Sequence, residues 1–503
     1  MIRSRLNFLI PTLIFVCTFA VLGSIVGSQS FGHDESVYLT KARSLMVGTP
    51  ADEFMIYRPI GMAVSGWALL KFSDSEICVR FFGVFFGAVS LVLIYLLFKR
   101  LFNVYVALFT TITVGTSTLF LQQAPLFQND IASSGLLFGV LLILYTYYES
   151  AGKSRVIYYI GPLVAGAFYL RYGVATTLAV IGILTLLFLV PRFIKKENAD
   201  YSKLSTSLFI SIFLFAPHFI QSFIVEGNLL GILTRSGAAA GREYFGEGLI
   251  SYIKWLPNEL GGWIFGVTVI IGIFTTIVFL FKKDLREGFP NLLWIGSIGI
   301  LNLLVTGILV HAEARYIFFP TVLLSGVGIA SLVWFIQKWP KVVANSLHVI
   351  FLIILLSWGA KNYSTVDSFF RARESDPYSV AYAEVSRIIH ADSISSSGCV
   401  VWTIPTNRPR VSWYSQCSTP KIGDAVLFEK DFDSYLRKDH YSLVRASLPG
   451  MQINRDSEEK YKIHLTEIYR TTNLSKLYGG DLIVYRISRK NSEEEDYLRL
   501  LEI

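Results

Sequence analysis

Long apolar segments separated by short polar loops run through residues 1–358 of the chain. A helix needs about 20 mostly apolar residues to cross the hydrocarbon core of a membrane. By this rule the pattern predicts about eleven membrane-spanning helices, at residues 6–27, 81–98, 104–121, 131–148, two within 156–190, 205–225, one that ends at 282, 292–310, and two that flank 338–341. The fold is therefore predicted to be mainly α-helical and polytopic.

Basic residues set the orientation, because cytoplasmic loops are enriched in Lys and Arg. Arg3 and Arg5 precede the first span, so the loop of residues 28–80 is predicted to lie outside the cytoplasm. The tract 156–190 is too long for one span, and we split it at Arg171 because this returns the next basic cluster to the cytoplasm. The same parity places the loop of residues 226–262 outside.

The pattern changes after residue 358. Apolar and polar residues alternate at 399–404, 425–428 and 482–487, which predicts strands, while 380–389 predicts a helix. Eleven spans place this region outside, so residues 1–358 are predicted to form a transmembrane domain and residues 359–503 an extracytoplasmic α/β domain. In an oxidising compartment Cys399 and Cys417 could form a disulfide, although their spacing alone leaves this open.

Composition supports a membrane protein, since 53% of the 503 residues are hydrophobic and only 16% are charged. The net charge of +8 comes from short clusters between apolar runs rather than from a continuous basic face, so nucleic acid is not a predicted partner. None of the four cysteines has metal-ligand spacing.

Two adjacent carboxylates, Asp34 and Glu35, follow the first predicted span. Placing an ionisable residue at the end of a membrane helix costs free energy, so such residues are usually paired or functional. One carboxylate of such a pair can accept a proton from a hydroxyl group while the other orients it. The alternative is that the pair simply begins a solvated loop.

Other ionisable candidates fall on the same predicted side. Five arginines are among them, because a guanidinium group can bind a phosphate with two hydrogen bonds and so suits an anionic lipid. They are Arg58, Arg171, Arg315 and, in the second long loop, Arg235 and Arg242. Simpler interpretations remain for three candidates. Arg58 could be an interfacial anchor, Arg315 could pair with Glu313, and Asp130 could only stabilise the start of the fourth span.

Several of these residues together resemble the GT-C glycosyltransferases, in the branch of protein O-mannosyltransferases and aminoarabinose transferases. The resemblance covers roughly residues 1–340 and is carried by short motifs: Asp34-Glu35 with Tyr38, the Arg58-Pro59 step, residues 77–80 before the second span, and Ala314-Arg315-Tyr316 with Pro320. Members of this family transfer a sugar from a polyprenyl monophosphate carrier to an acceptor outside the cytoplasm.

The resemblance implies roles for individual residues. It implies that Asp34 is the catalytic general base with Glu35 beside it, that Arg58 contacts the carrier phosphate, and that Asp130 is a second acid. Arg315 and Tyr316 match a basic-aromatic step beside the donor. Aminoarabinose transferases have an acid at the position of Tyr57, so the acceptor, whether lipid, glycan or protein, stays open.

The sequence thus predicts a multipass cell-membrane glycosyltransferase that takes a mannose-like or other hexose or pentose from a dolichyl or undecaprenyl monophosphate. Arginines would stabilise the departing phosphate, so a divalent metal is possible but not required. The alternative is a lipid or polysaccharide transporter or flippase that binds an anionic lipid with the same arginines and makes no bond, for which broken helices or inverted repeats are typical.

Overall fold

The chain forms two compact units. The computed structural model describes residues 2–47, 57–194, 202–238, 244–256, 260–282, 289–309, 311–374, 376–393, 398–403, 407–420, 438–446, 457–472, 474 and 480–489. The first unit, here called the membrane unit, comprises Met1–Val26, Tyr57–Met62 and Arg80–Phe369. The second, here called the sheet unit, comprises Gly27–Ile56, Ala63–Val79 and Phe370–Ile503. This division differs from the predicted domains, because most of the first loop groups with the C-terminal region.

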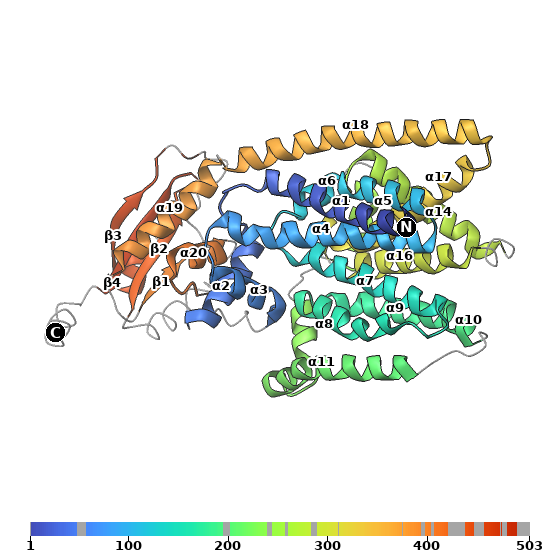
Figure 1. Ribbon diagram of the computed structural model, residues 1–503. Helices are drawn as coiled ribbons and strands as arrows, with labels where there is room; N and C mark the ends of the chain where they lie inside the picture. The colour runs from blue at the N-terminus through green and yellow to red at the C-terminus, as the bar shows by residue number, and fades with distance from the viewer. Residues whose placement is uncertain are drawn as a thin grey trace. The chain divides into compact units, whose positions relative to one another are not determined.

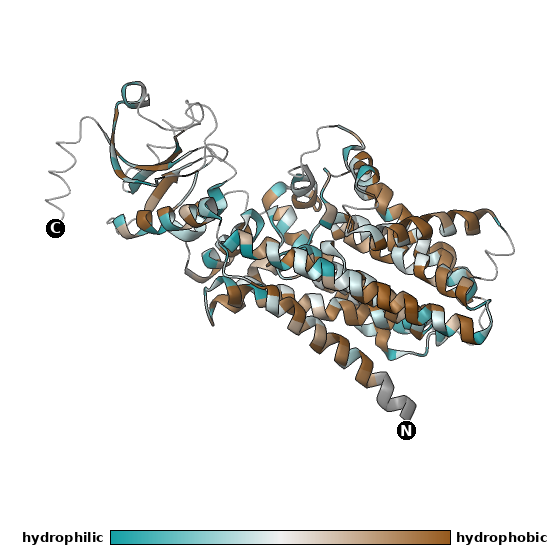
Figure 2. Ribbon diagram, turned by 90° about the horizontal axis from the view of Figure 1, so that it is seen from above, coloured by the Kyte–Doolittle hydropathy of each residue, from teal (hydrophilic) through white to brown (hydrophobic). Residues whose placement is uncertain are grey.

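Eight helices are long and apolar enough to cross a membrane within the described part of the chain, and hydrophobic residues dominate them (Figures 1 and 2). They are α1 (Ile2–Ile25), α4 (Glu76–Leu101), α7 (Asn129–Glu149), α11 (Ser202–Glu226), α14 (Trp263–Phe281), α16 (Pro290–Leu309), α17 (Phe318–Ile336, preceded by the 3-10 turn η3, Ala314–Ile317) and α18 (Lys341–Glu374). Each coincides with a predicted span, which confirms a mainly helical polytopic fold.

The other three predicted spans correspond to shorter apolar helices, α5 (Val104–Gly115), α8 (Ile160–Leu170, preceded by η2, Arg155–Tyr159) and α9 (Val174–Phe188). The tract 156–190 is broken at Arg171, as predicted: α8 ends at Leu170 and Arg171 is extended, with φ −152° and ψ 112°. The remaining short helices of the membrane unit are α6 (Thr118–Gln123), α10 (Val190–Ile194), α12 (Gly231–Ala238) and α13 (Glu247–Trp255).

Close packing of α14 against α17 lies in the interior of the membrane unit. A Cβ added to Gly272 of α14 would lie 1.9 Å from the carbonyl oxygen of Leu324, and one added to Gly328 of α17 would lie 2.0 Å from that of Thr268. The Thr268 and Ser325 hydroxyl oxygens are hydrogen-bonded at 2.7 Å. Small residues let membrane helices approach this closely, and a buried hydroxyl pair joins them.

The sheet unit contains a four-stranded sheet of order β1-β2-β4-β3, in which β1 and β2 are parallel and the other pairs antiparallel (Figure 1). Its elements are α2 (His33–Val47), part of α3 (Ile60–Leu70), α19 (Pro377–Asp392), β1 (Cys399–Trp402), α20 (Arg408–Ser415), β2 (Asp439–Arg445), α22 (Ser457–Tyr461), β3 (Ile463–Arg470) and β4 (Leu482–Arg489). Apolar residues of α19 and Val411 of α20 pack with one face of the sheet in a single buried core.

The sequence predicted this unit in part. The helix at 380–389 and the strands at 399–404 and 482–487 correspond to α19, β1 and β4, whereas the predicted strand at 425–428 lies outside the described residues. The strands β2 and β3 were not predicted. The prediction also treated residues 28–80 and 226–262 as loops without helices. The structure has α2 and α3 in the first of these segments and α12 and α13 in the second. These helices are too short or too polar to be recognised as membrane spans.

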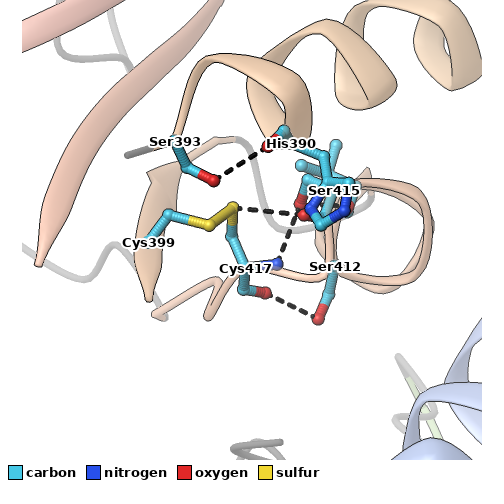
Figure 3. The surroundings of a disulfide bond; sticks show 7 residues. His390, Ser393, Cys399, Ser412, Ser415 and Cys417 are labelled. Carbon is cyan, nitrogen blue, oxygen red and sulfur yellow. Dashed lines mark hydrogen bonds between the residues drawn. A yellow bond between two sulfur atoms is a disulfide. The ribbon is translucent and has the colours of Figure 1, made fainter. Parts of the chain in front are cut away.

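A disulfide joins Cys399, at the start of β1, to Cys417, just after α20 (Figure 3). The end of α20 is further held by the Ser412 hydroxyl, which donates to the Cys417 carbonyl at 3.0 Å, and by the Cys417 N–H, which donates to the Ser415 hydroxyl at 3.2 Å. The covalent link and these bonds fix α20 to the edge of the sheet.

Candidate functional site

A buried carboxylate lies at the start of α7. Asp130 is in the first turn of this helix and is 2% exposed. The Arg171 Nη1 atom lies 2.7 Å from its Oδ1 atom, and the Arg315 Nε atom lies 3.7 Å from its Oδ2 atom. Two guanidinium groups from different helix ends therefore converge on one carboxylate.

Local structure explains how these side chains meet. Arg171 is the residue at which α8 ends, and the Asn129 amide donates to the carbonyl of Leu170 at 3.0 Å, which ties the end of α8 to the start of α7. Arg315 lies in η3, the turn that begins α17. A carboxylate in the first turn of a helix is also favoured by the helix dipole, so Asp130 stabilises α7 as well.

Aromatic side chains complete the arginine cluster, by which we mean Asp130, Arg171, Arg315 and Tyr316. The Tyr316 ring centroid lies 4.5 Å from Cζ of Arg171 and 5.5 Å from Cζ of Arg315, within the range of cation–π attraction. Beside it, the Tyr252 hydroxyl donates to the carbonyl of Glu313 at 3.3 Å. Burial raises the pKa of Tyr252 to about 12, so this phenol stays neutral at physiological pH.

Among the described residues, two guanidinium groups of the cluster lie against one buried carboxylate. The side chains of Arg171 and Arg315 are only 20% and 15% exposed, and they share Asp130. Glu313 lies 3.8 Å from Arg315, but its side chain is 44% exposed and therefore well solvated. The arrangement is suited to an anion that two arginine forks can approach. No group of three or more His, Cys, Asp or Glu among the described residues is placed to hold a metal ion.

Arg235 belongs to a different group of side chains. It lies in α12, and its Nη1 atom donates to the Tyr57 hydroxyl at 2.7 Å and to Glu226 Oε1 at 2.9 Å. Its charge is therefore matched by Glu226. Arg58 follows Tyr57 and is half-buried, and Arg242 lies outside the described residues. A Cβ on Gly61 would meet the Tyr169 carbonyl at 2.6 Å, so the segment that carries Arg58 packs against the end of α8.

Asp34 and Glu35 lie in the first turn of α2, in the sheet unit. Glu35 is 2% exposed, and its Oε2 atom accepts a hydrogen bond from the Gly32 N–H at 2.9 Å. Asp34 is more exposed than its neighbour, and Tyr38, one turn further along, is buried. The two acids thus differ in environment, and the Glu35 side chain satisfies the backbone N–H that precedes its own helix.

Sequence reasoning missed several residues around these groups. Tyr252 and Asn129 carry no charge, and each hydrogen-bonds to a backbone carbonyl beside the arginine cluster. In the sheet unit, Arg410 and Tyr414 contact the segment before Asp34 from a position far along the chain. The only signal for them was the density of Arg and aromatic residues in the segment 407–414.

Comparison with known proteins points to one class. Residues 59–220 match the model of a family described as dolichyl-phosphate-mannose-protein mannosyltransferase. The chain is similar in structure to ArnT from Cupriavidus metallidurans bound to undecaprenyl phosphate, with a TM-score of 0.66 and 12% identity over 94% of this chain and 97% of that one. No curated protein matches the sequence.

Archaeal structures of the same class are also similar. The Archaeoglobus fulgidus oligosaccharyltransferase tethered with an acceptor peptide has a TM-score of 0.61 and 11% identity over 88% of this chain and 70% of that one. AglB from the same organism, in complex with an inhibitory peptide and a dolichol-phosphate, has a TM-score of 0.58 and 10% identity over 87% and 69%.

These findings confirm the predicted resemblance to GT-C glycosyltransferases. The chain has the GT-C fold of a multipass membrane protein, with an ArnT-like arrangement along nearly its whole length. The matching family model is described as a mannosyltransferase and one of the similar structures is an oligosaccharyltransferase, in agreement with the predicted enzyme class.

Proposed function

We propose that the protein transfers a sugar from a polyprenyl monophosphate to an acceptor outside the cytoplasm. The observation that carries this proposal is the arginine cluster, in which Arg171 and Arg315 both lie against the buried carboxylate of Asp130. An anionic lipid headgroup would add a second negative charge beside the two guanidinium groups. The similarity to an ArnT structure bound to undecaprenyl phosphate supports a lipid phosphate as that anion.

Arg171 and Arg315 are proposed to hold the donor phosphate, with Arg58 as a further contact. When the bond between the anomeric carbon and the phosphate oxygen breaks, negative charge builds on the phosphate. Fixed guanidinium groups in a partly buried site stabilise this charge more than water would, because they need no reorganisation. The Tyr316 ring keeps both forks in place.

Asp34 is proposed as the general base. The Glu35 carboxylate is engaged with the Gly32 backbone, whereas Asp34 is the more exposed of the two and thus better suited to meet an acceptor hydroxyl. The hydroxyl proton passes to the Asp34 carboxylate as the oxygen attacks the anomeric carbon. The polyprenyl phosphate leaves with the electron pair of the broken carbon–oxygen bond.

The sheet unit and this chemistry are proposed to lie on the extracytoplasmic side. The Cys399–Cys417 disulfide supports this, since structural disulfides persist in oxidising compartments. The basic residues Lys99 and Arg100 at the end of α4 support the same orientation by the positive-inside rule. The acceptor can be a lipid, a glycan or a protein.

A transfer assay tests the proposal. Purified protein in nanodiscs is mixed with undecaprenyl phosphates that carry mannose, glucose or 4-aminoarabinose, together with membrane extract as acceptor, and release of undecaprenyl phosphate is measured. Asp34→Asn is expected to lower the rate about 10²- to 10⁴-fold, the usual contribution of a general base. Binding of undecaprenyl phosphate should stay within about twofold.

Two outcomes would contradict parts of the proposal. Equal rates for the parent protein and Asp34→Asn would remove Asp34 as the base. Tight binding of undecaprenyl phosphate without release from any donor, combined with movement of the lipid across vesicles, would favour the transporter. Glu149→Gln serves as the control variant, because this carboxylate lies at the opposite end of α7 from Asp130 and is one-third exposed.

A further inference from the structure

The backbone immediately before Asp34 is held by a helix from the C-terminal region. The Phe31 N–H donates to the Tyr414 hydroxyl at 2.9 Å, and the Arg410 Nε–H donates to the Phe31 carbonyl at 3.0 Å. Both partners belong to α20, and all these residues belong to the sheet unit. Both backbone polar groups of Phe31 are therefore satisfied by side chains about 380 positions along the chain.

Side-chain packing strengthens this contact. Phe31 is fully buried, and its ring lies edge-on against Trp413, with 5.6 Å between centroids. The Tyr414 hydroxyl accepts from Phe31 and donates to Glu76 Oε1 at 2.8 Å, so it uses its single donor and one acceptor position. Loss of this one oxygen would remove one hydrogen bond from the Phe31 N–H and one from Glu76.

A second contact lies three turns further along α2. The Arg43 Nη1 atom donates to the Trp413 carbonyl at 2.5 Å, and its Cζ atom lies 3.7 Å from the centre of the Trp413 ring. The helix α20 therefore holds α2 at both its start and its third turn. In turn, α20 is fixed by the Cys399–Cys417 disulfide that follows it.

The chain between Phe31 and Asp34 has little freedom. The Gly32 N–H donates to Glu35, and the Ser36 N–H donates to the Gly32 carbonyl at 3.0 Å, which closes the first turn of α2. With Phe31 held by α20 and Gly32 held by the helix itself, the position of the Asp34 backbone is determined from both directions.

We propose that Arg410 and Tyr414 are positioning residues that hold the Phe31 backbone and thereby set where the Asp34 carboxylate lies. The catalytic consequence rests on the proposed function of Asp34 as a base. The anchoring itself does not, so the two can be tested separately. A misplacement of a catalytic group by about 1 Å can lower a rate on the order of 100-fold.

The first measurement is hydrogen–deuterium exchange on the full chain in nanodiscs. The amides of Phe31 and Ser36 are expected to exchange about tenfold faster in Tyr414→Phe and in Arg410→Lys than in the parent, because the first variant removes the acceptor of the Phe31 N–H and the second replaces the fixed guanidinium donor by a flexible ammonium group. Tyr469→Phe and Arg486→Gln are the matched controls. The Tyr469 hydroxyl donates to Glu384 and Arg486 pairs with Asp392, so both contacts join the sheet to α19 rather than to α20.

The second measurement is the transfer assay with the undecaprenyl phosphate sugars. Tyr414→Phe and Arg410→Lys are expected to lower kcat roughly 10- to 100-fold, with the KM for the donor within about twofold, while the controls keep the parent kcat. A general loss of folding would instead lower the amount of active protein in the controls as well.

The outcomes separate the two ideas. Unchanged exchange at Phe31 and Ser36 in both variants would overturn the anchoring. Faster exchange with an unchanged kcat would overturn the positioning role. If Asp34→Asn is as active as the parent while exchange rises in Tyr414→Phe, then the assignment of Asp34 fails and the anchoring stands.

Discussion

Neutralising Asp130 is expected to have opposite effects on stability and on binding of a lipid phosphate. Asp130→Asn keeps the shape of the side chain but removes the buried negative charge that, among the described residues, Arg171 and Arg315 share. Breaking a buried ion pair by removing one partner costs about 3–5 kcal/mol, because the remaining charge stays buried without compensation. Two arginines are affected, so Asp130→Asn is expected to lower the free energy of unfolding by an amount in this range.

The phosphate of a bound lipid would supply the missing negative charge. If it recovers only about 1.4 kcal/mol of the lost pairing energy, the Kd for undecaprenyl phosphate falls about tenfold. Arg171→Gln and Arg315→Gln are expected to act in the other direction. Each removes a charge-assisted hydrogen bond worth about 1.5–3 kcal/mol, which raises the Kd about tenfold or more.

The assay is titration of undecaprenyl phosphate into protein in nanodiscs of uncharged lipid, followed by thermal unfolding with and without the ligand. Ligand is expected to raise the Tm more in Asp130→Asn than in the parent. Glu149→Gln, at the other end of α7, is the control, because the pair between Arg100 and Glu149 is partly exposed and such pairs contribute only about 0–1 kcal/mol.

A single result would refute the reasoning. If Asp130→Asn weakens lipid binding as much as Arg171→Gln does, then the excess positive charge of the cluster is not what binds the phosphate. The cluster would then be a structural ion pair that joins the ends of α7 and α8.

Three further predictions concern packing, the disulfide and the acidic pair. Gly272→Leu is expected to separate α14 from α17 and lower the Tm by several degrees, whereas Gly182→Leu, where a Cβ meets nothing within 4 Å, should change it little; equal effects would argue against the close crossing. Cys417→Ser should cost about 3 kcal/mol of stability, measured by denaturant unfolding, and reductant should destabilise the parent but not the variant. Glu35→Gln keeps an acceptor for the Gly32 N–H, so its transfer rate should fall less than about tenfold, and a larger loss would give Glu35 a chemical role.

The membrane spans were predictable because the length and the hydropathy of a segment can be determined from that segment alone. The break at Arg171 is an example, since an arginine inside an apolar tract that is too long for one span leaves few alternatives. The short helix α2 was not predictable in the same way. It is neither long nor apolar, and its clearest signal, two acids in its first turn, was interpreted as chemistry rather than as a helix start.

The strands show the same limit. In β2, five consecutive residues are buried, so apolar and polar positions do not alternate and the period of a strand is hidden. In β3 the register shifts between Glu467 and Tyr469, which breaks the alternation that is otherwise present. By contrast, β1 and β4 are rich in β-branched residues and each begins shortly after a glycine, so both could be recognised as strands.

The residue types of the arginine cluster were predictable, but their partners were not. A helix end with an acid or an arginine is visible in a sequence, whereas the pairing of Asp130 with Arg171 and Arg315 depends on how α7, α8 and η3 pack. Arg235 illustrates the consequence, because it was a phosphate candidate by type and the structure pairs it with Glu226. Charge and position on the chain identify candidates, and burial with counter-charge decides among them.

The acidic pair follows the same logic. The sequence left two interpretations for Asp34 and Glu35, a helix or loop start on one hand and proton transfer on the other. A carboxylate that already accepts a backbone N–H from a buried position is committed to the fold, and Glu35 meets this description. Asp34 lies beside it on the same turn, is more exposed, and follows Phe31, whose backbone N–H and C=O are both hydrogen-bonded to side chains of α20. The structural interpretation therefore suits Glu35, and the proposed role in proton transfer is left to Asp34, whose backbone lies in the same helical turn.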